Sequence, residues 1–235
     1  METERRRFLA SAAALGIGGF SAGGVSRADD KKDKKDDKDK KDEEEVAAAE
    51  DLMREHGVLN RILLVYEEGL RRLRSKEDVP PEAFQKPAQL VRKFVEDYHE
   101  KLEENFIFPE FEKKKKLTDL IVVLRRQHDA GRRVTDVILR NSTGDRFTKE
   151  DARKEMAAAI VSFIRMYRPH EAREDTVLFP ALHQVLSTKQ LKDLGEQFEK
   201  EEDRLFGDEG FEKTVDQVAA IEKQLGIYDL AQFTA

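Results

Sequence analysis

The feature that most constrains the fold is a histidine–glutamate pair that the chain contains twice. His99 is followed four residues later by Glu103, and His170 is followed four residues later by Glu174. In both copies a Phe-Pro step comes shortly after the glutamate. Residues four apart share one face of a helix, so each copy directs an imidazole and a carboxylate the same way. The repeat therefore predicts two helices that bring the same pair of side chains to a common interior.

Two more histidines belong to the same pattern, because His56 precedes the first copy and His128 precedes the second at nearly the same distance. Around all four histidines, apolar residues recur at steps of three and four, which is typical of a helix with one buried face. Each of four predicted helices thus carries one histidine in its apolar seam. The seam residues include Leu52, Leu59, Leu63, Val95, Leu102, Ile121, Leu124, Ile138, Ile160, Phe163 and Tyr167.

Turn signals indicate where these helices end. The first is expected to end at the break 79–81, which holds two consecutive prolines, and the second to begin near Pro87 and run toward Pro109. The third is expected to end at the turn 141–144, and Thr148 is expected to cap the fourth. Together these elements place the folded domain at residues 46–186.

A helical extension is expected to follow at residues 187–235. Ser187 and Gln190 have the spacing of a capping box, which predicts the start of one further helix. Residues 211–225 predict a last helix after a glycine-containing turn. This extension carries no recognisable chemistry.

The amino terminus is expected to lie outside the folded domain. Residues 1–28 hold Arg5-Arg6-Arg7-Phe8-Leu9 ahead of a weakly apolar run, and this resembles a twin-arginine export signal of the form RRxFL. A signal anchor or a fortuitous basic terminus is the alternative. Residues 29–45 are seventeen consecutive charged residues, which predicts a disordered, solvated linker. The protein is therefore expected to be periplasmic or otherwise exported, with no membrane association once the signal is removed.

The composition excludes several classes of partner and site. Although 39% of the residues are charged, the signs nearly balance to a net charge of −6 at pH 7, and the chain has no basic stripe. This argues against nucleic acid as a partner. The chain contains no cysteine, so any metal must be held by nitrogen and oxygen atoms.

A metal centre accounts for the seam histidines and glutamates together. A carboxylate in an apolar seam is costly and is rarely buried without a partner, so two of them indicate cations between them. A single seam histidine is more often an ordinary core residue, but four of them with two glutamates favour a dinuclear site. Such ligands suit iron or manganese better than calcium or magnesium, and zinc is compatible. The predicted metal ligands are His56, His99, Glu103, His128, His170 and Glu174.

Two nearby residues are set apart from these six. His183 lies outside the repeat and is expected at the surface or the rim of the bundle. Tyr167 lies in the seam of the fourth helix, where it is expected to pack in the core with a partner for its hydroxyl group. A hydrogen bond from Tyr167 to a metal ligand is the alternative.

With these residues, the stretch from about 46 to 186 resembles the hemerythrin family, also called the HHE cation-binding domain. The resemblance implies an all-α, up-and-down four-helix bundle with extra C-terminal helices, built around two nonheme irons per chain with an oxo or hydroxo bridge. The four seam histidines would be terminal ligands, and Glu103 and Glu174 would bridge the irons. Oxygen-carrying members have another histidine one turn after the ligand of the third helix, where this chain has Arg132. The set of six is more similar to bacterial hemerythrin-like proteins implicated in the repair of iron centres under nitrosative stress.

Two functions fit such a site. The first, favoured here, is a protein that binds iron and a small diatomic ligand, oxygen or nitric oxide, at an open di-iron site. The second is a di-iron oxidoreductase that reduces peroxide, oxygen or nitric oxide in stress defence with an external electron donor. A structural bundle with an incidental zinc is a third interpretation. Binding is favoured because no sequence feature identifies a donor site.

Replacing Arg5 and Arg6 by lysine is expected to strand the protein in the cytoplasm. The reason is that a twin-arginine route suits a protein that folds and loads its cofactor before it crosses the membrane. The measurement is the fraction of protein recovered from the periplasm. Arg27→Lys, which makes the same exchange outside the motif, is the control. Equal recovery of the double variant and the wild type would indicate a different route or no export.

Overall fold

The computed structural model describes residues 48–234, and within that range all regular structure is helical. The proposed signal, 1–28, and the charged linker, 29–45, lie outside the described residues, so both stay predictions. None of the described helices is long and apolar enough to cross a membrane. The expectation of an all-α chain is confirmed.

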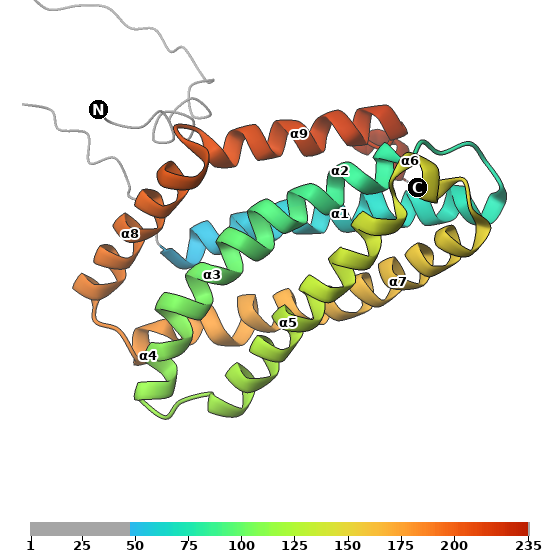
Figure 1. Cartoon of the computed structure of the whole chain (residues 1–235). Coiled ribbons are helices and arrows are strands. Elements are labelled where there is room, and N and C mark those ends of the chain that lie inside the picture. The colour runs from blue at the N-terminus through green and yellow to red at the C-terminus, as the bar shows by residue number, and fades with distance from the viewer. Residues whose placement is uncertain (1–47, 235) are drawn as a thin grey trace, which may run out of the picture. The chain divides into compact units, whose positions relative to one another are not determined.

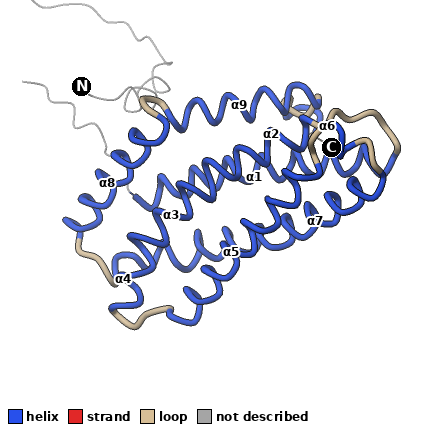
Figure 2. The backbone as a smooth tube through the Cα atoms, viewed as in Figure 1, coloured by secondary structure: helices blue, strands red, loops and turns tan. Residues whose placement is uncertain are grey.

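Four long helices form the bundle, and Figures 1 and 2 show them side by side. Each packs against the helix before and after it in the chain, and the fourth returns to the first. The connections are short, which gives the expected up-and-down arrangement. The first helix is α1 (Ala48–Ser75) and the third is α5 (Thr118–Asn141). The second runs without a break through α2 (Glu82–Leu90), a π-helical segment (Val91–His99), α3 (Glu100–Leu102), a second π-helical segment (Glu103–Ile107) and α4 (Phe108–Lys113).

The fourth helix is built like the end of the second as far as the Phe-Pro step. It comprises α7 (Glu150–Arg173), a π-helical segment (Glu174–Leu178) and a 3₁₀ segment (Phe179–Gln184). In both helices the π-helical segment begins at the glutamate of the repeat. The backbone N–H groups of Phe108 and Phe179 donate to the carbonyls of Glu103 and Glu174, five residues back. A proline crowds the preceding turn of an α-helix and lacks a donor, so this wider turn accommodates the Phe-Pro step.

Two expected helix starts were wrong. The second helix begins at Glu82 rather than near Pro87, because the carbonyl groups of Pro80 and Pro81 accept the first backbone hydrogen bonds, from Ala83 and Phe84. A proline has a φ suited to a helix start, and the pair therefore opens the helix that we placed further along. The fourth helix begins at Glu150 without a side-chain cap. The Thr148 hydroxyl donates instead to the carbonyl of Asp145, in the short α6 (Gly144–Phe147).

The C-terminal helices cover the first two helices of the bundle. α8 (Thr188–Phe206) opens with the expected capping box of Ser187 and Gln190, and α9 (Gly210–Leu225) follows it. A 3₁₀ turn (Leu230–Phe233) comes last. α9 lies along α1 and α2, as Figure 1 shows, and α8 packs on α1 and the π-helical segment Val91–His99. The buried side chains that join these helices to the bundle core are Leu194, Phe198, Val218, Ile221 and Leu225.

Candidate metal centre

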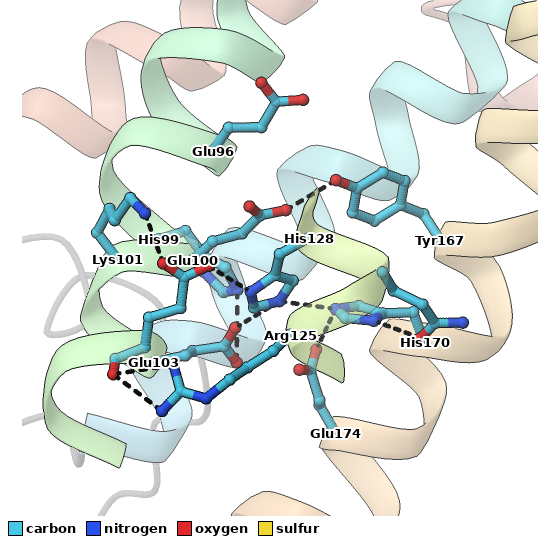
Figure 3. Close-up of polar contacts among 12 residues, drawn as sticks. Glu96, His99, Glu100, Lys101, Glu103, Arg125, His128, Tyr167, His170 and Glu174 are labelled. Carbon is cyan, nitrogen blue, oxygen red and sulfur yellow. Dashed lines mark hydrogen bonds and ion pairs between the residues drawn. The ribbon is translucent and has the colours of Figure 1, made fainter. Parts of the chain in front are cut away.

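The fold brings all six predicted ligands to one place in the middle of the bundle. Each helix contributes one histidine, and the second and fourth also contribute the glutamates. Every one of the six is buried, with at most 4% of its surface exposed, and both glutamates are fully buried. Figure 3 shows how Glu103 and Glu174 approach the imidazoles from opposite helices. His183 is exposed and takes no part, as expected.

The four imidazoles form two pairs. The Nε2 atoms of His56 and His99 lie 3.0 Å apart, and those of His128 and His170 lie 3.3 Å apart. Two lone-pair nitrogens that face each other at this distance need a proton or a metal between them. Each pair can therefore hold one proton or one metal ion between its nitrogens.

The two glutamates lie between the imidazole pairs. Glu103 has one carboxylate oxygen 3.9 Å from Nε2 of His99 and the other 3.4 Å from Nε2 of His128. Glu174 has an oxygen 3.5 Å from Nε2 of His56 and 3.1 Å from Nε2 of His170. Both carboxylates thus reach both pairs. One group of potential ligand atoms comes from His56, His99 and Glu103, and a second from Glu103, His128, His170 and Glu174.

The donor set fits a pair of metal ions. None of the four carboxylate oxygens of Glu103 and Glu174 has a hydrogen-bond partner among the described residues, although all are buried. A buried carboxylate oxygen without a partner costs free energy that only a cation or a proton can offset. Four imidazole nitrogens and two carboxylates supply nitrogen and oxygen donors suited to iron, manganese or zinc. The residues present therefore fit the dinuclear centre that the sequence predicts.

In the metal-free site, burial and neighbouring charges shift the pKa values of both glutamates and of His56. Burial and the charge of Glu174 raise the pKa of Glu103 well above its usual value. Burial opposes ionisation of Glu174 too, but its ion pairs with His170 and His56 outweigh burial and lower the pKa of Glu174. Burial also opposes protonation of His56, but its bonds to Asp175 and Glu174 raise the pKa of His56 to about 10. Protons thus compensate the buried charge, and a metal ion must displace them to bind.

A second layer of residues holds the imidazoles by their other nitrogen, and the sequence analysis missed it. The Nδ1 atoms of His99 and His128 lie 2.7 and 3.0 Å from carboxylate oxygens of Glu55 and Glu104. An Nδ1–H that donates to a carboxylate leaves Nε2 unprotonated and aimed at the site. The remaining contacts are His170 with Gln127 at 2.9 Å and His56 with Asp175 at 2.7 Å.

These four contacts close a ring around the bundle. Each acceptor is the chain neighbour of a predicted ligand, and it bonds a histidine of the next helix. Glu55 of the first helix contacts His99 of the second, and Glu104 of the second helix contacts His128 of the third. Gln127 of the third helix contacts His170 of the fourth, and Asp175 of the fourth helix contacts His56 of the first. The sequence could have pointed to these acceptors, because each stands next to a predicted ligand. A step of one residue along a helix turns the side chain toward the neighbouring helix.

The Phe-Pro step of each repeat also contributes to the site. The ring of Phe108 stacks on His128, and the ring of Phe179 stacks on His56, both with centroids 5.5 Å apart and planes 22° apart. Both phenylalanines are buried, so they cover one face of each imidazole with apolar surface. The repeat therefore supplies a ligand pair and a hydrophobic cover for a histidine of another helix.

Arg132 faces the second helix. Its guanidinium lies 2.7 Å from a carboxylate oxygen of Glu100 and 2.8 Å from one of Glu104. The Tyr167 hydroxyl donates to the other oxygen of Glu100 at 2.7 Å, so its partner is not one of the six predicted ligands. Gly131 makes this possible, because a Cβ at that position would lie 2.0 Å from the tyrosine oxygen. A buried polar layer thus lies beside the site.

Removing an acceptor of the ring is expected to weaken metal binding. Gln127→Leu deletes the acceptor for Nδ1 of His170, and loss of such a partner typically lowers metal affinity about 10- to 100-fold. The measurement is competition for the metal with a coloured chelator. Gln85→Leu, a half-buried glutamine on α2, is the matched control. The interpretation fails if both variants bind metal as tightly as the wild type.

Comparison with known proteins agrees with this geometry. The model of the hemerythrin HHE cation-binding domain matches residues 47–182, which include all six predicted ligands. Uncharacterized proteins of Mycobacterium tuberculosis and Mycobacterium bovis are each 53% identical over 189 residues, which cover 80% of this chain and 74% of theirs. No solved structure matches the chain. The chain belongs to the hemerythrin HHE cation-binding domain family.

Proposed function

We propose that the chain binds two iron ions in the centre of its bundle and takes up a small diatomic ligand, oxygen or nitric oxide, outside the cytoplasm. The observation that carries the proposal is the position of Glu103 and Glu174, whose buried oxygens accept no hydrogen bond from the described residues and lie within ion-pair distance of both imidazole pairs. Membership of a cation-binding family supports the metal. The RRxFL motif at Arg5-Arg6 supports export.

The number of donors leaves room for a small ligand. With two imidazoles and one oxygen from each glutamate, each ion has four protein donors, fewer than the six that iron accepts. A bridging oxo or hydroxo group and one exogenous molecule can occupy the remaining positions. Iron, when bound, supplies the affinity for oxygen and nitric oxide.

The surrounding residues fix these donors and keep bulk water away. The ring of Nδ1 contacts holds each imidazole in one tautomer and one orientation. Phe108 and Phe179 cover two of the imidazoles. A rigid, buried site with open coordination positions suits a small uncharged ligand better than a large substrate.

A di-iron oxidoreductase that reduces peroxide, oxygen or nitric oxide is the second candidate. The observation that favours it is Arg132, which pairs with Glu100 and Glu104 where an oxygen carrier has another histidine. The two ions then have equal numbers of protein donors, and each keeps an open position. A ligand that reaches both ions is harder to release unchanged, which favours reaction over reversible binding.

The protein from Asp29 onward, expressed with iron, is expected to purify with about two irons per chain, the number that its donors can hold. Glu103→Gln and Glu174→Gln should each lose both irons, because each carboxylate reaches both imidazole pairs. Glu222→Gln, a buried carboxylate that pairs with Arg61 away from the site, is the control. Elemental analysis that finds one zinc, or no metal after reconstitution with iron, would exclude the proposed di-iron site.

The reduced, iron-loaded protein is expected to form no long-lived oxygen adduct and to oxidise to the di-ferric state. Arg132→His should lengthen the life of the adduct, because it restores the ligand type of the oxygen carriers. Stopped-flow absorbance after mixing with oxygen measures the lifetime of the adduct and the rate of oxidation to the di-ferric state. Arg132→Asn is the matched control, because it removes the same ion pairs without adding an imidazole. A wild-type adduct that releases its oxygen on degassing would restore the carrier function and reject this prediction.

A further inference from the structure

The C-terminal extension places one carboxyl group in contact with a buried residue of the second helix. Glu202 lies on α8 and is only 3% exposed, although it belongs to a helix outside the four-helix bundle. One of its oxygens lies 3.4 Å from the hydroxyl of Tyr98, on the second helix. Tyr98 immediately precedes His99, so the extension reaches the neighbour of a predicted ligand.

A continuous series of polar contacts leads from this carboxylate to the site. The Tyr98 hydroxyl lies 3.1 Å from the first carboxylate oxygen of Glu55. The second oxygen of Glu55 accepts from Nδ1 of His99 at 2.7 Å. Nε2 of His99 faces the site. Glu202 is therefore connected to a predicted ligand through two side chains, and all four residues are buried.

The extension is built to hold Glu202 in this position. The backbone N–H of Phe211, at the start of α9, donates to the other carboxylate oxygen at 2.7 Å. The residue before it is Gly210, where a Cβ would lie only 2.9 Å from that same oxygen. The turn between α8 and α9 thus brings a donor to the carboxylate at a close approach that only glycine permits.

We propose that Glu202 is a positioning residue for the metal site, through which the C-terminal extension sets how strongly His99 donates to its metal ion. The inference rests on the proposed function, because it assigns a role toward the ion at the His56–His99 pair. It gives the extension a function that its sequence alone does not indicate.

The direction of the effect follows from the hydrogen that Tyr98 shares. The hydroxyl has one hydrogen to donate and two carboxylates within reach, so Glu202 competes with Glu55 for it. The more firmly Tyr98 bonds Glu55, the less strongly Glu55 accepts from Nδ1–H of His99. An imidazole whose Nδ1–H bond weakens becomes a poorer donor at Nε2. Glu202 therefore strengthens His99 as a ligand.

Two substitutions are expected to act in opposite directions. Glu202→Gln keeps the acceptor for Phe211 and turns its amide toward Tyr98, which releases the hydroxyl hydrogen to Glu55 and weakens the bond to His99. Tyr98→Phe deprives Glu55 of that hydrogen and strengthens the bond to His99. The proton resonance of His99 Nδ1–H in the metal-free protein should shift upfield in the first variant and downfield in the second. In the iron-loaded protein the reduction potential should rise in the first and fall in the second.

Glu222→Gln is the matched control, because Glu222 is also a buried carboxylate of the extension and pairs with Arg61 of α1. Glu222→Gln should leave the His99 Nδ1–H resonance and the reduction potential at their wild-type values. An unmoved His99 resonance in Glu202→Gln, shifts of the same sign in both test variants, or an equal shift in the control would overturn the proposal. If Glu202→Gln does not fold, the His99 resonance in Tyr98→Phe tests the proposal by itself. An unchanged resonance in that variant would show that Tyr98 does not act on His99 through Glu55. The resonance requires no metal, so its result is separate from the iron analysis that tests the proposed function.

Discussion

Two buried carboxylates that accept no hydrogen bond from the described residues, and whose ion-pair partners there are imidazoles, are the constraint on which the rest of this structure depends. Glu103 and Glu174 lie at the centre of an apolar bundle, where an uncompensated charge costs several kcal/mol. Such a cost is tolerated only if positive charge is supplied between the helices. Four imidazoles aimed at the same space are unfavourable neighbours for one another unless cations separate them. Metal ions between the helices would therefore meet the charge of the carboxylates and the lone pairs of the imidazoles together, and protons meet them in the metal-free site.

The ring of Nδ1 contacts explains how four helices hold this arrangement. Each helix supplies a predicted ligand and also the acceptor that orients a ligand of the next helix. A rotation of any one helix would disturb its own histidine and that of a neighbour. The site is thus specified by the relative rotation of all four helices, and a metal that binds it stabilises their mutual packing.

The sequence predicted the parts of this site that depend on position within one helix. The spacing of His99 and Glu103 and its repeat at His170 and Glu174 required only helical geometry, and the structure brings these residues together as the pattern indicated. The ring could not be predicted, because the pairing of Glu55 with His99 depends on how two helices are rotated against each other. The start of the second helix was missed because Pro80 and Pro81 were treated as a break, whereas they also satisfy its first donors.

The two imidazole pairs differ in what lies behind their nitrogens, although their donor types match. Behind His99 the series runs through Glu55 and Tyr98 to the C-terminal extension. Behind His128 it runs through Glu104 to Arg132, whose positive charge withdraws electron density from that carboxylate. A carboxyl group of the extension lies behind one histidine and a guanidinium behind the other, so two chemically equal sets of predicted ligands have unequal surroundings. Contacts outside the six predicted ligands are therefore where this bundle can adjust the chemistry of its site without changing the donor set.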